Sequence, residues 1–180
     1  MSMTCRQKAV RRQGMALWPW LLILMLVISL ALVLQYANRN LAMANQCREQ
    51  MKRIYGALGF YEVQNGSLPA MRFYPEDPRK DEDSLRLVLE AYGLDPGDTI
   101  CPSAQPLVRE TGLSYLWNVN LNKQVLSAGR QSEWLMTEIE VMSSKLRGPH
   151  FRHYHVMYTD GHVQRTDTVP HEVPGTTWRD

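Results

Sequence analysis

The feature that most constrains this chain is an uninterrupted apolar run near its N-terminus, MALWPWLLILMLVISLALVL, from Met15 to Leu34. The run contains no charged residue, and Ser29 carries its only hydroxyl group. As a helix it would extend about 30 Å, which matches the hydrocarbon core of a bilayer. Pro19 would then fall in the first turn, where its missing backbone N–H costs little. The run therefore predicts a transmembrane helix.

The orientation of this helix follows from the lengths of the segments on its two sides. Basic residues occur both before the run, from Arg6 to Arg12, and after it, from Arg39 to Arg53. The positive-inside rule is therefore not decisive. A short leader is easily retained in the cytoplasm, whereas the long segment after the run has the size of an exported domain. We expect a cytoplasmic N-terminus; a cleaved signal peptide is the alternative, although Ala42-Met43-Ala44 lies far beyond the run.

Residues 35–64 continue the helical pattern beyond the apolar run. No turn signal occurs before Asn65-Gly66, and apolar side chains recur at intervals of three and four residues, which is the spacing of one helix face. The stripe consists of Ala44, Cys47, Met51, Ile54, Leu58 and Tyr61. Because the heptad pattern is too short for a stable coiled coil, we expect this stripe to pack on the chain's own globular part.

The globular part begins with loops and a short helix. The acidic loop 76–83 lacks EF-hand spacing, so we interpret it as a solvated loop and not as a calcium site. A helix is expected over Leu85–Tyr92, ended by Gly93. A second loop follows around Cys101.

The C-terminal part has the residue pattern of an antiparallel sheet. Leu113–Val119 is a candidate strand, and Glu133–Val141 fits either a strand or a helix. The strongest signal is Asp160-Gly161 between HYHVMYT and HVQRT. As the centre of a type I′ turn, this dipeptide would pair Tyr158 with Val163 and His155 with Thr166.

The predicted fold class is thus α+β, with a long N-terminal helix packed on a small antiparallel sheet. The expected segments are a cytoplasmic leader 1–14, a transmembrane helix 15–34, an amphipathic helix 35–64, a globular domain 65–167 and an irregular tail 168–180.

Four of the five histidines lie between His150 and His162, on or beside the predicted hairpin. Strand alternation puts His153, His155 and His162 on one largely polar face, which we expect to contact water. These side chains do not converge on one point, as zinc ligands must. We therefore predict no metal and no cofactor at this cluster.

Other signatures of catalysis or nucleic-acid binding are missing from the sequence. The net charge is +2 with dispersed basic residues, which gives no electrostatic footprint for nucleic acid. There is no glycine-rich phosphate loop, and Ser103, Ser114 and Ser132 lack the context of a nucleophile elbow. We expect a protein that is not an enzyme.

The three cysteines divide by position. Cys5 would be cytoplasmic and reduced, whereas Cys47 and Cys101 would lie in an oxidising compartment. Those two are candidates for a disulfide, and the sequence leaves open whether they come within bonding range.

Several motifs occur together in one order along the chain. Cys47 begins a helical segment that ends in Asn65-Gly66 and Leu68-Pro69, and Cys101-Pro102-Ser103 follows. Ser114-Tyr115 with Asn118 comes next, and His150 is then separated by nine residues from Asp160-Gly161. This series resembles the bacterial prepilin-type processing-associated proteins, which are named for His, nine residues and Asp-Gly.

The resemblance implies a type IV pilin-like or type II secretion pseudopilin-like protein without catalytic activity. Such a protein would be a minor subunit or an assembly factor in the bacterial inner membrane, with a periplasmic domain. Its partners would be the lipid bilayer, other pilin-like subunits through the N-terminal helix, and prepilin peptidase. The alternatives are an anchored extracytoplasmic binding module and a histidine-cluster metalloenzyme.

The leader departs from the prepilin pattern at one position. Gly14-Met15 resembles the cleavage junction, but Pro19 stands where pilins carry Glu, and no acid precedes Glu49. In a pilus that glutamate neutralises the new α-amino group of a neighbouring subunit, where an unpaired charge in the membrane is expensive. We therefore expect an uncleaved anchor, with cleavage after Gly14 as the alternative.

Overall fold

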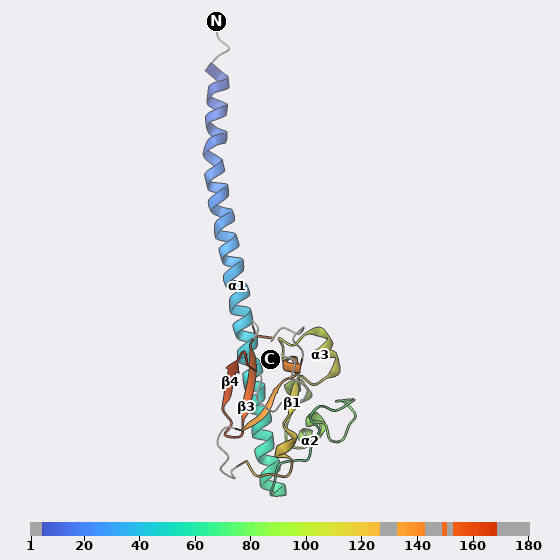
Figure 1. Ribbon diagram of the computed structural model, residues 1–180. Coiled ribbons are helices and arrows are strands. Elements are labelled where there is room, and N and C mark those ends of the chain that lie inside the picture. The colour runs from blue at the N-terminus through green and yellow to red at the C-terminus, as the bar shows by residue number, and fades with distance from the viewer. Residues whose placement is uncertain (1–4, 127–132, 143–148, 151–152, 169–180) are drawn as a thin grey trace. The chain divides into compact units, whose positions relative to one another are not determined.

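The computed structural model describes residues 5–126, 133–142, 149–150 and 153–168, with the backbone alone for residues 5–17 (Figure 1). The chain forms two compact units, Met1–Asn40 and Leu41–Asp180. Helix α1, Cys5–Asn65, runs through the first unit and into the second. The predicted tail 168–180 lies outside the described residues except for Thr168.

In the first unit, α1 exposes an apolar surface. The side chains from Trp18 to Leu34 are exposed, for example 69% at Leu26. In the part of the chain that the structure describes, one helix, α1, is long and apolar enough to cross a membrane. The Ser29 hydroxyl donates to the Leu26 carbonyl at 2.8 Å, so it is satisfied within the helix.

The position of Pro19 differs from the prediction. α1 begins at Cys5, so Pro19 lies inside the helix and not in its first turn. There it leaves one carbonyl of the preceding turn without its usual donor. The sequence pattern missed this because the polar residues before Met15 carry no apolar periodicity.

The second unit combines the end of α1 with short helices and one sheet. Its helices are α2 (Leu85–Glu90), η1 (Pro96–Thr99), α3 (Pro106–Thr111), η2 (Val119–Leu121) and η3 (Ile139–Met142). Its strands are β1 (Tyr115–Trp117), β2 (Trp134–Glu138), β3 (Tyr154–Tyr158) and β4 (Val163–Thr166). They form an antiparallel sheet in the order β1-β2-β3-β4. The expected α+β class, with a long apolar N-terminal helix and a small antiparallel sheet, is confirmed.

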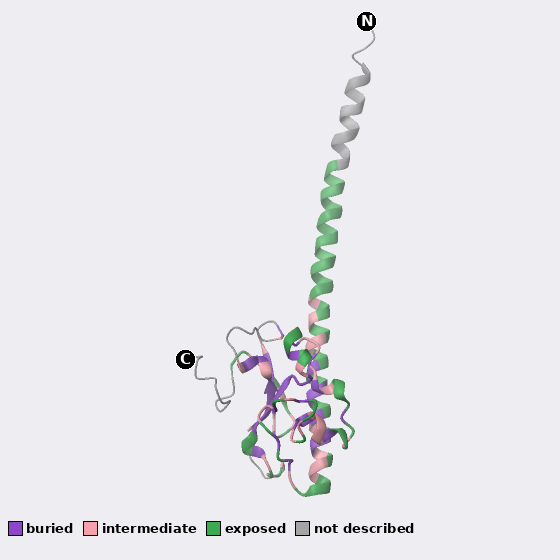
Figure 2. Cartoon of the chain, turned by 90° about the vertical axis from the view of Figure 1, so that its right-hand side faces the viewer, coloured by how far each residue is buried: buried purple, intermediate pink, exposed green. Residues whose placement is uncertain are grey.

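The core of this unit lies between α1 and the sheet. Cys47, Met51, Ile54 and Leu58 are each 0% exposed, as the three-four periodicity predicts. Figure 2 shows buried stretches of α1 where the helix runs through the second unit. The four side chains belong to the same buried cluster as side chains from β1, β2 and β3. The latter include Tyr115 and Trp117 of β1, Met136 of β2 and Met157 of β3.

Two regions are more regular than the sequence indicated. α3 forms directly after the loop that was expected around Cys101, in a stretch for which no element was predicted, and Pro106 opens it. A proline at the first helical position is favourable, because no hydrogen bond is lost there. The ambiguous run 133–141 divides into β2 and η3.

The β3–β4 register is shifted by one residue from the predicted one. Met157 pairs with Val163 and His155 with Arg165. The Gly161 N–H donates to the Tyr158 carbonyl at 2.9 Å, and the Tyr158 N–H donates to the His162 carbonyl at 2.9 Å. The connection is therefore a three-residue loop with Gly161 left-handed at φ 80°, and not a type I′ turn.

The prediction that His155 and Met157 face water from β3 is wrong. His155 is 4% exposed and Met157 is 0% exposed, and Met157 belongs to the cluster on α1. The opposite face is buried as well, by a second cluster that includes Leu116, Val141 and Val156. Because both faces of β2 and β3 are covered, a polar residue on either face of these two strands must find a partner inside the protein.

The hairpin loop is held directly against α1. The Tyr55 hydroxyl donates to the Thr159 carbonyl at 3.0 Å, and a Cβ at Gly161 would lie 2.9 Å from Tyr55 Cε1. Gly66 has a similar backbone, at φ 77°, but nothing lies within 4 Å of its Cβ position.

We predict that Gly161→Ala destabilises the second unit more than Gly66→Ala does. Both variants carry left-handed strain of about 1–2 kcal/mol. Gly161→Ala adds the overlap with Tyr55, for which overpacking costs about 1–3 kcal/mol. Urea unfolding of the detergent-solubilised protein, followed by near-ultraviolet circular dichroism, measures the difference. Equal losses in the two variants would show that the contact with Tyr55 relaxes freely.

Candidate functional site

A cluster of buried polar and sulfur-containing side chains lies where α1 meets the sheet. Glu138 ends β2, His155 lies on β3, and His150 forms an isolated bridge with His153. Cys47 from α1 and Cys101 from the loop after η1 lie beside them. The cluster therefore joins α1 and the Cys101 loop to the strands β2 and β3 and to the His150 bridge.

Glu138 is the centre of the polar interactions. Its Oε1 accepts from His150 Nε2 at 2.8 Å and from His155 Nδ1 at 3.2 Å. Its Oε2 accepts from the His155 backbone N–H at 3.0 Å. The side chain of Glu138 is 0% exposed, and that of His150 is 1% exposed. Both carboxylate oxygens are thus satisfied without solvent.

The surroundings of Glu138 favour its ionised form. Burial by itself raises the pKa of this carboxyl, but the hydrogen bonds from His150 and His155 outweigh it and hold the pKa below its ordinary value. Buried charges need partners of this kind, because removing a carboxylate from water without pairing it costs on the order of several kcal/mol.

Glu140 is a second buried acid with a less favourable environment. Its Oε1 accepts from the Gln105 N–H at 3.3 Å, and its Oε2 makes no hydrogen bond among the described residues. Burial, together with the charge of Glu138, raises the pKa of Glu140 to about 7. This carboxyl therefore titrates in the neutral range.

Cys47 and Cys101 form a disulfide in the structure, with their Cα atoms 5.0 Å apart. Both residues are 0% exposed. The bond ties α1 to the loop before α3 across 54 residues of sequence. Closing a loop of this length stabilises a fold by about 4 kcal/mol in the chain-entropy account.

The disulfide and the polar cluster are in contact. Cys101 Sγ lies 3.6 Å from His150 Nε2. The side-chain donor atoms of Cys47, Cys101, Glu138 and His150 all lie within 4.8 Å of one another. Sulfur, imidazole and carboxylate are the zinc ligands that proteins use. These residues are the ones in the described part of the chain that are placed to hold a metal ion.

The structure divides the residues that the sequence singled out. Cys47, Cys101 and His150 come together, whereas His162 is exposed on the hairpin. His155, expected to face water, is part of the cluster. Glu138 was missed altogether, because a single acid at the end of an apolar strand gives no signal until the sheet's pairing is known.

The remaining signature residues support the backbone. The Asp160 carboxylate accepts from the His162 N–H at 2.9 Å, which closes the hairpin loop. The Asn65 side chain donates to the Tyr61 carbonyl at 2.9 Å, and the Gly66 N–H donates to the Glu62 carbonyl at 2.7 Å, so both end α1. Gly14 and Met15 lie in the part of α1 for which only the backbone is described.

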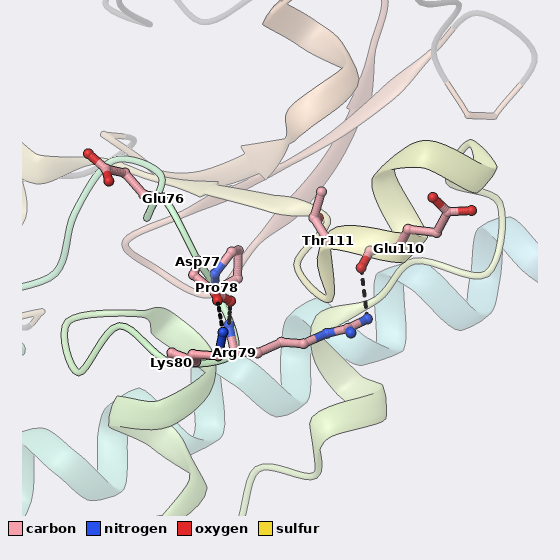
Figure 3. A pocket seen from close by; sticks show the side chains of 7 residues that line it. All are labelled: Glu76, Asp77, Pro78, Arg79, Lys80, Glu110 and Thr111. Carbon is pink, nitrogen blue, oxygen red and sulfur yellow. Dashed lines mark hydrogen bonds and ion pairs between the residues drawn. The ribbon is translucent and has the colours of Figure 1, made fainter.

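A surface hollow of about 310 Å³ lies on the acidic loop (Figure 3). It is lined by Glu76, Asp77, Pro78, Arg79, Lys80, Glu110 and Thr111. Arg79 donates to the Glu110 carbonyl at 2.7 Å, and Lys80 pairs with Asp77 at 3.0 Å. The hydrogen bond from Lys80 lowers the pKa of Asp77. The charges that line this hollow thus stabilise the loop itself.

Comparisons with protein-family models, curated proteins and solved structures gave no match for this chain. The atoms of the cluster are shielded from solvent, which suits a structural role.

We predict that Glu140→Gln removes a pH dependence of stability in the disulfide-bonded protein. A folded-state pKa of about 7, above the ordinary value of 4.5, means that the protonated acid favours folding. That contribution is complete below the unfolded pKa and is lost as pH rises through 7. The variant should therefore gain up to about 3 kcal/mol over the wild type near pH 8, and less than about 1 kcal/mol near pH 5.

Urea midpoints of both proteins at the two pH values measure this gain. Glu90→Gln, which changes an exposed acid in α2, serves as the control and should give equal shifts at both. A Glu140→Gln gain that does not grow with pH would contradict the raised pKa.

Proposed function

We propose that this chain is a single-pass, membrane-anchored structural protein of pilin-like design. It would act as a minor pseudopilin-like subunit or assembly factor of a type II secretion or type IV pilus-like system. The observation that carries this proposal is the double use of α1. Its side chains from Trp18 to Leu34 are exposed and apolar, while Cys47, Met51 and Ile54 are buried in the core of the second unit.

The roles of the signature residues support a structural function. Cys47 and Cys101 bond α1 to a loop, and Gly161 allows the hairpin to lie against Tyr55 of α1. His150 pairs with Glu138 in the interior. The disulfide and Gly161 hold the domain to its own helix, and the His150–Glu138 pair stabilises the interior of the domain. None of them offers a reactive group to solvent.

The disulfide supports placement of the second unit outside the cytoplasm. Disulfides persist in oxidising compartments such as the bacterial periplasm and are rare in the cytosol. Because the described part of α1 has one apolar segment, this placement would put the leader side of that segment in the cytoplasm. The exposed segment would then contact lipid and the corresponding segments of neighbouring subunits.

We expect that the full chain is extracted from membranes by detergent and not by alkaline carbonate. The double variant Leu24→Arg with Leu26→Arg should appear in the soluble fraction, since each arginine near the middle of a spanning helix costs about 2.5–3.5 kcal/mol. Leu107→Arg makes the same change at a position that is 72% exposed in the second unit, and it should leave the protein in the membrane.

Retention of the double arginine variant in the membrane would contradict the proposed anchor. The intact mass of the extracted wild type also distinguishes an uncleaved chain from one that begins at Met15.

Assembly through α1 predicts cross-links between copies in the membrane. A photoreactive residue at Val27, which is 57% exposed, should give products larger than a dimer in cells that produce the chain. The control position is Val63, which is 85% exposed at the far end of α1. Monomer alone at Val27 would exclude assembly through this segment and leave a membrane tether as the proposed role.

A further inference from the structure

The cluster around Cys47 of α1 contains more potential metal ligands than are needed to attach the helix to the domain. A disulfide alone would hold α1 to the Cys101 loop. The structure nevertheless places a buried carboxylate and a buried imidazole against the two sulfur atoms, all within 4.8 Å. The four residues come from α1, the Cys101 loop, β2 and the His150 bridge.

One pair of these atoms already has the spacing of a tetrahedral zinc site, and the two sulfur atoms must move apart when the disulfide is reduced. With Zn–S bonds near 2.3 Å and Zn–N or Zn–O bonds near 2.0–2.2 Å, neighbouring ligand atoms lie roughly 3.3–3.8 Å apart. Cys101 Sγ and His150 Nε2 are 3.6 Å apart. His150 Nε2 and Glu138 Oε1, at 2.8 Å, need to separate by roughly half an ångström to one ångström to admit the ion.

We propose that reduction of the Cys47–Cys101 disulfide converts this cluster into a closed zinc site, with Cys47, Cys101, Glu138 and His150 as the four ligands. Two thiolates, one imidazole and one carboxylate fill a tetrahedral shell, and every ligand residue is at most 2% exposed. The site has no open position for water, so its role is structural.

A trialkylphosphine and one water molecule are sufficient to reduce the disulfide. A trialkylphosphine attacks one sulfur and breaks the S–S bond; with one water it becomes the phosphine oxide, and the two sulfurs become thiols. Zinc then displaces the two thiol protons, which pass to solvent. The proton on His150 moves to Nδ1, so that the lone pair of Nε2 is free to bind the metal.

The neighbours of the ligands fit this arrangement. His155 donates to Glu138 from its ring at 3.2 Å and from its backbone N–H at 3.0 Å, so it would orient the ligating carboxylate. His150 Nδ1 is buried and makes no hydrogen bond among the described residues. Oε2 of Glu140 is likewise buried without a hydrogen-bond partner in the described part of the chain. Once the proton has moved to Nδ1, His150 would offer a hydrogen-bond donor and Glu140 an acceptor around the metal ligands.

The consequence is that the domain has two ways to attach α1 to the Cys101 loop. In an oxidising compartment the link is covalent, and under reducing conditions a metal ion replaces it. The reduced chain would keep the same fold as long as zinc is present, because binding energy at such a site is folding energy.

The test uses the full chain in detergent with Cys5→Ser, so that the two cluster cysteines are the only thiols. Because both cysteines are fully buried, the protein is reduced with a trialkylphosphine in denaturant and refolded with or without zinc sulfate. We expect one zinc ion per reduced chain and none per oxidised chain, measured by elemental analysis after gel filtration. Zinc should also raise the Tm of the reduced protein.

Four variants separate ligands from bystanders. Glu138→Gln and His150→Ala should each weaken zinc binding by more than about 100-fold, the upper end of outer-shell effects, in competition with a chromogenic chelator. His155→Gln, which changes an outer partner, should weaken it by about 10–100-fold. His162→Ala, an exposed histidine of the same hairpin, is the matched control and should bind as the parent does.

Cobalt(II) gives a second readout that does not depend on stability. The reduced parent should show sulfur-to-cobalt charge transfer and the intense visible bands of a tetrahedral site, and Glu138→Gln should alter those bands. If the reduced chain does not refold alone, zinc should restore its circular dichroism. The proposal is overturned if zinc binds neither form, if the oxidised form binds equally well, or if binding ignores Glu138 and His150.

Discussion

The packing of α1 on the inner face of the sheet holds the second unit together. The four described strands have only three to five residues each, and a sheet of this size needs a hydrophobic face packed against another element; here the stripe that includes Met51, Ile54 and Leu58 covers that face. Each such side chain contributes about 1.5–3 kcal/mol when it is fully buried. The domain therefore needs the helix as its central element.

The polar chemistry of the domain follows from this packing. Once α1 covers the sheet, an acid at the end of β2 lies in the interior and must be paired. His150 and His155 are the partners of Glu138. Glu140 has one oxygen without a partner among the described residues, and burial together with the charge of Glu138 raises its pKa to about 7. The disulfide beside them fixes the helix at the same place.

The same helix also carries the exposed apolar segment, and this links two properties of the chain. A change that loosens the core around Cys47 would free α1 from its packing on the sheet, while the chain itself keeps the domain connected to the element that we propose as its membrane anchor. A cross-link between α1 and the Cys101 loop holds the domain in place on this helix. A disulfide serves this purpose, as would the proposed zinc ion.

The sequence predicted the elements that depend on local periodicity. These are the apolar run, the stripe from Ala44 to Tyr61 and the hairpin around Asp160-Gly161, because spacing along the chain indicates which side chains share a face. The hairpin register and the burial of His155 could not be predicted in this way, since both depend on tertiary contacts. The register depends on a left-handed Gly161 against Tyr55, and burial depends on what covers each face of the sheet. Glu138 could not be found from sequence, because its partners are brought to it by strand pairing and not by spacing along the chain.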